Sequence, residues 1–228
     1  MKKIAFLISL FFSIVAVAQN QAMDQLVYEI RNPETDAPHF RKALSKIGEY
    51  LALNVLEELS TKEVAVETLT GKIAQHRLVE ESPVLITILR AGLPLNDGVQ
   101  CVFPHSEVGF IAMSRNEKTL KSQVDYIGIP CLKGRCVILS DTMLATGGSL
   151  VDAIAIIQKY EPKKIYVIAA VASVQGVSRL QSSCPDVKIF AAVTDPSLND
   201  KGYIIPGLGD AGDRAYGNKC HLEIEEES

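Results

Sequence analysis

The hydrophobic positions of the chain follow two patterns that alternate along the sequence, one typical of helices and one typical of buried strands. Between residues 40 and 59, the apolar positions recur every three or four residues, which predicts a helix that buries one face. Later apolar runs are short, continuous and bounded by turn residues, as in strands that are covered on both faces. These runs are residues 84–89, 108–113, 135–140, 165–172 and 187–193.

Helical spacings separate these strand-like runs. One helix is predicted directly after residues 84–89, a second over residues 150–157, and a short third over 175–180. Alternation of this kind predicts an α/β domain in which helices flank a parallel sheet. Residues 64–73, with Gly71 in the turn, predict two short strands that form a β-arm.

The N-terminus has the form of an export signal. Two lysines precede an apolar run at residues 4–18 that ends in Ala-Val-Ala, and Met23 stands just before the first globular pattern. Two explanations remain open, true export or translation from Met23. We therefore expect residues 1–22 to be a leader or a mis-assigned extension, and residues 23–228 to form one domain.

Composition narrows the possible partners. A chain of 228 residues with 47% hydrophobic content can bury one full core. Its net charge of −4 does not indicate the basic surface that binds nucleic acid. After the N-terminal run, no apolar run is long and uncharged enough to span a membrane. The five cysteines are dispersed and form no C-x-x-C pair, which argues against a disulfide framework or a zinc site and favours a reducing compartment.

The stretch 137–150 carries the first candidate chemistry. An apolar run ends in Asp141, and Gly147 and Gly148 precede a helical pattern. Glycine allows the backbone to approach a ligand closely, and a helix N-terminus offers N–H groups and a partial positive charge to a phosphate. An acid at the carboxyl end of a strand can accept hydrogen bonds from sugar hydroxyls. Taken alone, these features also fit ordinary turn and cap chemistry.

The same stretch closely resembles the loop of uracil phosphoribosyltransferases that binds 5-phosphoribosyl 1-pyrophosphate (PRPP). Thr142 departs from the proline usual in that family, and Ser140 stands where many other phosphoribosyltransferases place a second acid. Because threonine has a freer backbone and an N–H, we expect Thr142→Pro to be tolerated. The resemblance assigns PRPP binding to Asp141, Thr142, Met143, Leu144, Ala145, Thr146, Gly147, Gly148 and Ser149.

Two arginines are typical of surface positions when each is considered alone. Arg90 directly follows a buried strand and precedes Ala91 and Gly92, and Arg115 lies in a polar segment. The guanidinium fork suits the oxygens of a pyrophosphate. In order along the chain, residues 88–92 and 115–117 resemble the pyrophosphate loop and the second PRPP-binding arginine of the same family.

Glycine is concentrated near the C-terminus, between residues 203 and 213. A glycine-rich coil exposes backbone N–H and C=O groups. These groups can form hydrogen bonds with the edge of uracil that presents an acceptor, a donor and a second acceptor. A flexible loop is the alternative. By resemblance, Ile204, Gly209, Asp210 and Ala211 line the uracil site, and Asp210 also touches PRPP.

The resemblance extends over residues 30–219 and implies a phosphoribosyltransferase-type α/β fold with a parallel sheet, an N-terminal helix, a β-arm and a C-terminal base-binding segment. It implies that uracil and PRPP react to give UMP and diphosphate, with Asp141, Arg90 and Arg115 as catalytic residues. Mg²⁺ would be bound through the substrate, with no direct protein ligand. The family is oligomeric, commonly dimeric, and some members respond to GTP.

Three other interpretations of the function remain open. They are a phosphoribosyltransferase for another base, a pyrimidine-sensing RNA-binding regulator on the same fold, and an exported protein that has lost its substrates. Because PRPP is a cytosolic metabolite, we expect a cytoplasmic enzyme, in conflict with the signal-like residues 1–18.

Overall fold

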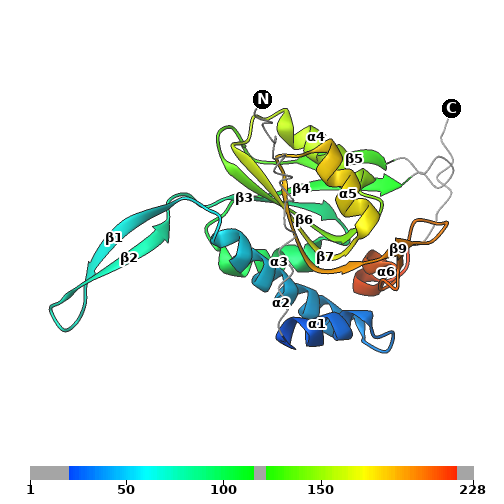
Figure 1. Cartoon of the computed structure of the whole chain (residues 1–228), viewed down its shortest axis with the longest axis horizontal. Helices are drawn as coiled ribbons and strands as arrows, with labels where there is room; N and C mark the ends of the chain where they lie inside the picture. Colours follow the sequence, from blue (N-terminus) through cyan, green and yellow to red (C-terminus); the bar gives the residue numbers. More distant parts are fainter. Residues whose placement is uncertain (1–20, 116–121, 220–228) are drawn as a thin grey trace, which may run out of the picture.

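A six-stranded sheet forms the centre of the chain in the computed structural model, which describes residues 21–115 and 122–219 (Figure 1). The strand order is β5-β4-β3-β6-β7-β8, and the five strands from β4 to β8 in this order run parallel. The predicted α/β fold is confirmed. The strands are β3 (Val84–Leu89), β4 (Val108–Arg115), β5 (Ser122–Gly128), β6 (Cys136–Leu144), β7 (Lys164–Ser173) and β8 (Lys188–Asp195).

The edge strand β5 makes the sheet mixed, whereas the apolar runs predicted a parallel one. It pairs antiparallel with β4, with a register irregularity between Ala112 and Met113. Residues 123–127 are all exposed, so β5 lacks the continuous apolar run that marked the buried strands.

Helices cover both faces of the sheet because side chains alternate along each buried strand. In β6, Ile138 faces one hydrophobic cluster, and Val137 and Leu139 face the other. The first cluster includes residues of α1 (Gln21–Arg31), α2 (Ala37–Leu56), α3 (Leu93–Val102) and α6 (Ala211–Tyr216). The second includes residues of α4 (Gly148–Gln158) and α5 (Val174–Ser183), which lie on the opposite face in Figure 1.

Helix α2 has the buried stripe that the sequence predicted. Asp36 caps its N-terminus by accepting the N–H of His39 at 2.9 Å. Phe40, Leu44, Ile47, Leu51 and Val55 are fully buried on its inner face. This stripe packs α2 against the sheet and against α3.

Helix α1 lies outside the ranges in which hydrophobic spacing predicted helices. It begins at Gln21, and its Met23 and Ile30 side chains are buried in the same core as α2. Residues 1–20, which hold most of the signal-like segment, lie outside the described part of the chain. Within the described ranges, no helix is both long and apolar enough to cross a membrane.

The predicted β-arm is also present. Strands β1 (Thr61–Glu67) and β2 (Ile73–Val79) pair antiparallel and extend away from the body of the domain in Figure 1. Gly71 adopts the left-handed backbone conformation in the turn, with φ of +72°. The remaining strands, β9 (Ser197–Leu198) and β10 (Ile204–Ile205), form a small antiparallel ladder after the sheet.

Candidate active site

The predicted pyrophosphate and phosphate loops follow the carboxyl ends of strands in the central sheet. Strands β3 and β6 are parallel neighbours, so the loops that follow their carboxyl ends lie side by side. In open α/β sheets, this carboxyl edge is where ligands bind. Arg115 is the last residue of β4, which pairs with β3 on its other side. Asn116 and Glu117, the rest of the predicted arginine motif, lie outside the described residues.

The loop after β3 is packed tightly against β6. The peptide between Leu89 and Arg90 is cis, and Gly92 follows two residues later. A Cβ on Gly92 would lie 2.4 Å from Thr87 Oγ1 and 2.8 Å from the carbonyl oxygen of Ser140, so only glycine fits there.

From this loop, the Arg90 side chain reaches the C-terminal segment. Its Nη2 donates to Asp213 Oδ1 at 2.7 Å, and its Nη1 donates to the carbonyl of Gly217 at 3.4 Å. Asp213 lies in α6, two residues after Ala211, the last residue that the resemblance assigns to uracil. The structure therefore brings the predicted pyrophosphate loop and the predicted base segment together.

Asp141 is buried at the centre of this arrangement. It is 8% exposed and lies inside β6, because the strand continues to Leu144 rather than ending at residue 140. Burial raises the pKa of the Asp141 carboxyl to about 7, and the backbone N–H groups of Met143 and Thr142 partly oppose this shift by favouring the charged form. The carboxyl can thus change its charge near neutral pH.

The turn after β6 leads directly into a helix. Gly147 occupies the N-cap of α4 with φ of +77°, and it has no side chain with which to cap the first-turn N–H groups. Thr146 Oγ1 accepts the N–H of Gly148 at 3.5 Å. Glycine is required here because L side chains rarely adopt this φ. The turn has the geometry of an anion site at a helix N-terminus.

The end of β7 and the start of α5 hold this turn in place. The buried Ser173 hydroxyl donates to the carbonyl of Ala145 at 2.6 Å and accepts the N–H of Gly176 at 2.8 Å. A Cβ on Gly176 would lie 2.3 Å from the same carbonyl. Arg179 donates to the carbonyl of Thr146 at 3.3 Å. The path of the turn is therefore fixed by its neighbours as well as by its own glycines.

The predicted base residues begin at β10 and end at the first residue of α6. Ile204 and Ala211 are both 3% exposed and belong to the core, whereas Gly209 and Asp210 are exposed. Gly209 has φ of +86°. Asp210 caps α6 by accepting the N–H of Asp213 at 2.9 Å. Because Gly209 and Asp210 are exposed between the buried residues Ile204 and Ala211, their backbone groups are accessible to a small planar ligand.

Comparison with known proteins decides the family. The family model described as uracil phosphoribosyltransferase matches residues 17–218. The chain belongs to the uracil phosphoribosyltransferase family. A uracil phosphoribosyltransferase of Aquifex aeolicus is 42% identical over 186 residues, covering 82% of this chain and 89% of that protein. One from Dictyoglomus thermophilum is 40% identical over 207 residues, covering 90% and 100%.

A solved structure shares the fold of this chain. The AQ2163 protein from Aquifex aeolicus superposes with a TM-score of 0.84 at 37% identity, over 91% of this chain and 100% of that one. These similarities confirm the resemblance that the four motifs indicated. They support a uracil phosphoribosyltransferase rather than a transferase for another base or an RNA-binding regulator.

Several contacts at the site of this uracil phosphoribosyltransferase family member were not identified from the sequence. Ser173 was identifiable as a helix N-cap before residues 175–180, but its bond to Ala145 was not. Thr142 is fully buried, and its Oγ1 donates to the carbonyl of Ala91 at 2.6 Å. This hydrogen bond joins the predicted PRPP loop to the loop that carries Arg90.

The Thr142 contact revises the expectation that proline is tolerated at this position. We now expect Thr142→Pro to lower the free energy of unfolding by about 1–3 kcal/mol, because it leaves the Ala91 carbonyl without its donor. It also removes the N–H that favours the charged form of Asp141. Urea unfolding checks this, with Thr142→Ser as the control that keeps the hydroxyl. Equal stability of the proline variant and the wild type would contradict it.

Proposed function

We propose that the chain transfers the phosphoribosyl group of PRPP to N1 of uracil, producing UMP and diphosphate. One observation carries the proposal: Arg90, in the loop after β3, forms an ion pair with Asp213, next to the base segment. The diphosphate leaves the same anomeric carbon that the base attacks. The residues that bind diphosphate and those that bind uracil must therefore lie close together. Membership of the uracil phosphoribosyltransferase family supports the same reaction.

The proposed division of work follows from the chemistry of PRPP. Asp141 holds the ribose hydroxyls, and residues 145–149 bind the 5′-phosphate at the N-terminus of α4. Arg90 and Arg115 hold the pyrophosphate, to which the guanidinium fork is suited. The backbone of residues 142–144 connects Asp141 to this phosphate-binding turn, and Asp210 contacts PRPP from the base side.

The proposed uracil site is formed mainly by backbone. The buried residues Ile204 and Ala211 border the site and anchor the exposed turn between them, and the backbone around Gly209 and Asp210 forms hydrogen bonds with the polar edge of the ring. A side chain at Gly209 would require a strained φ, which fits a role in close approach.

The reaction needs no side-chain nucleophile. The bond from uracil N1 to the anomeric carbon forms, the bond to the diphosphate oxygen breaks, and the N1 proton is released. Positive charge develops on the ribose, near the Asp141 carboxylate, while the two arginines stabilise the departing diphosphate. Mg²⁺ carried by the oxygens of PRPP would neutralise diphosphate charge, and it fits a site whose acid, Asp141, becomes a carboxylate more readily beside a cation.

The proposed activity is tested by mixing the full chain with uracil, PRPP and Mg²⁺ and quantifying products by mass spectrometry. We expect UMP and diphosphate in equal amounts, and no product when EDTA removes the metal. Hydrolysis of PRPP without UMP would contradict the transfer. Repeating the assay with GTP tests whether this member shares the activation seen in some relatives.

We also propose that the protein forms a homodimer through its β-arm. Val66, Leu69, Ile73 and Leu78 are 48%, 109%, 69% and 52% exposed on the arm, and this apolar surface would be covered by a second copy. Light scattering of the wild type should give twice the chain mass, and Leu69→Ser with Ile73→Thr should shift it toward the monomer. A monomeric wild type would contradict the proposal.

We further propose a cytoplasmic location, since PRPP is available there. A polypeptide that begins at Met23 keeps both buried residues of α1 and should be as active as the longer chain. Cell fractionation with N-terminal sequencing is the test. Protein found outside the cytoplasm, beginning at Gln19, would establish export instead.

A further inference from the structure

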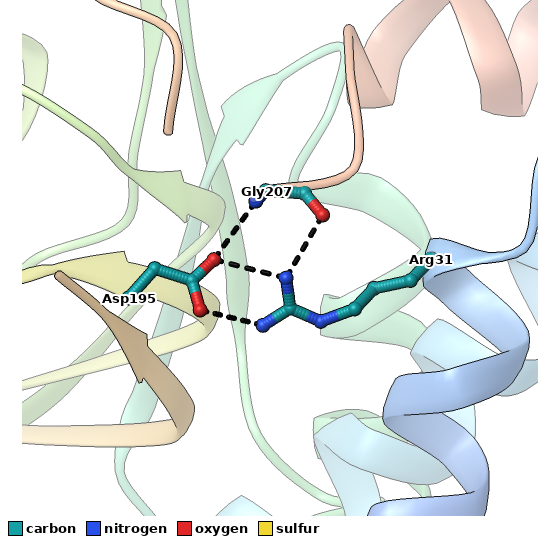
Figure 2. Close-up of polar contacts among 3 residues, drawn as sticks. All are labelled: Arg31, Asp195 and Gly207. Atoms are coloured by element: carbon teal, nitrogen blue, oxygen red, sulfur yellow. Dashed lines mark hydrogen bonds and ion pairs between the residues drawn. The ribbon is translucent and has the colours of Figure 1, made fainter. Parts of the chain in front are cut away.

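A partly buried ion pair joins the N-terminal helix α1 to the segment proposed to bind uracil. Arg31, the last residue of α1, donates from Nη2 to Asp195 Oδ1 at 2.6 Å and from Nη1 to Asp195 Oδ2 at 3.0 Å. Asp195 ends β8 and is 3% exposed. The pairing is bidentate, the geometry that gives an arginine the most orientational specificity. Figure 2 shows the two side chains facing each other beside Gly207.

Both partners also hold the backbone of Gly207. Asp195 Oδ2 accepts the N–H of Gly207 at 2.9 Å, and Arg31 Nη1 donates to the carbonyl of Gly207 at 3.0 Å (Figure 2). These two bonds fix the peptide planes on either side of the Gly207 Cα, and therefore its φ and ψ. Gly207 has φ of +57°, and a Cβ there would lie 2.1 Å from the carbonyl oxygen of Ile204.

The next peptide is held by another arginine. Arg214 Nη1 donates to the carbonyl of Leu208 at 3.2 Å, and its Nη2 donates to the carbonyl of Asn32, just after α1, at 2.7 Å. In a trans peptide, the N–H points opposite to the C=O. The hydrogen bond from Arg214 to the Leu208 carbonyl therefore sets the direction of the Gly209 N–H. This N–H is one of the groups proposed to form a hydrogen bond with the base.

We infer that Arg31 and Asp195 are positioning residues for uracil: by clamping both sides of Gly207, they set the backbone that reads the base. The inference rests on the proposed base site. It makes α1 a part of uracil recognition, although no residue of α1 belongs to the predicted site. The effect is on binding, because a loosened segment holds its competent conformation for only a fraction of the time. The apparent affinity for uracil falls by that fraction, while a saturated enzyme reacts normally.

The test compares the Michaelis constants for the two substrates in Arg31→Lys and Asp195→Asn. Lysine keeps the positive charge beside Asp195, so the fold is retained, but a single ammonium cannot reproduce the fork that also reaches Gly207. We expect the KM for uracil to rise about tenfold in Arg31→Lys, as for the loss of one hydrogen bond, with kcat and the KM for PRPP within about twofold. Asp195→Asn should have a similar effect, and the double variant should be far less than additive.

The matched control is Lys188→Gln. Lys188 begins the strand that Asp195 ends, and its Nζ forms an ion pair with Glu58 at 2.7 Å. Losing this pair should leave both Michaelis constants unchanged, which shows that a broken ion pair on β8 does not by itself impair uracil binding.

Gly209→Ala separates the inference from the base-site assignment on which it rests. Its Cβ would meet no atom within 4 Å, so alanine acts only through the strained φ of +86°. If the KM for uracil rises in Gly209→Ala but not in Arg31→Lys, the positioning role of Arg31 and Asp195 is overturned. The base-site assignment is then still supported. Equal rises for uracil and PRPP in Arg31→Lys also overturn it. Wild-type constants in both variants overturn the base-site assignment and the inference together.

Discussion

Asp141→Asn is expected to lower kcat/KM for PRPP about a hundredfold, in line with the loss of one charged contact in a closed site. Asparagine keeps the shape of the side chain but cannot provide the negative charge that ribose hydroxyls and a developing cation would face. Steady-state kinetics at saturating uracil measure the loss. Unimpaired kinetics would mean that Asp141 has only a structural role.

The same substitution should stabilise the ligand-free protein. The pKa of Asp141 is raised to about 7 in the fold, above its ordinary value of 3.8, so between these pH values the folded chain holds a proton that the unfolded chain has lost. The contribution of this group to stability is therefore present below about pH 4 and lost as the pH rises through about 7. The full shift corresponds to about 4 kcal/mol, and asparagine avoids that cost.

Urea unfolding of the two proteins at several pH values measures this effect. The stability advantage of Asp141→Asn should grow by about 3 kcal/mol between roughly pH 5 and pH 8, because the unfolded wild-type carboxyl is ionised throughout that interval whereas the folded one keeps its proton until about pH 7. The wild-type kcat/KM for PRPP should rise with pH over the same range and become flat in the variant. An advantage that does not change with pH would show that Asp141 is not the buried acid described.

Arg90→Gln is expected to lower kcat by about a thousandfold, because the departing diphosphate loses its main side-chain donor. The side chains of Arg90 and Asp213 are 37% and 30% exposed, and a solvent-exposed ion pair contributes little to stability, so little of the effect should come from misfolding. Circular dichroism should therefore match the wild type.

Arg90→Lys serves as the matched variant. Lysine keeps the charge but loses the planar fork, so its kcat should lie between those of the wild type and Arg90→Gln. If both variants turned over at the wild-type rate, Arg90 would be a surface arginine, as it appears when the sequence around it is considered alone.

The parts of this protein that local sequence determines were predictable. Buried strands such as β3 and β7 have continuous apolar runs, and the turn at Gly147 is encoded in its own residues. The edge strand β5 was missed because its exposed residues make no apolar run. Helix α1 was not predicted, because the helical spacing of Met23, Leu26, Val27 and Ile30 covers only about two turns and is too short to separate from the apolar run before it.

Contacts between distant segments could not be predicted. Arg31 and Asp195 are 164 positions apart, and no local pattern indicates that a helix end will meet this strand end. The bond from Thr142 to Ala91 likewise depends on β3 and β6 being neighbours. Motifs therefore identified the candidate ligand-binding residues, whereas the residues that hold them in place emerged only from the fold.

The central claim is that this chain is a phosphoribosyltransferase for uracil, and a competition between bases tests it most directly. Equal concentrations of uracil, cytosine and hypoxanthine are incubated with PRPP, Mg²⁺ and the full chain, and the nucleotides are separated and quantified. A base edge read by fixed backbone groups should reject analogues with the wrong donors by a factor of about ten thousand, so UMP should be the only nucleotide detected. Formation of IMP or CMP in amounts comparable with UMP would contradict the account.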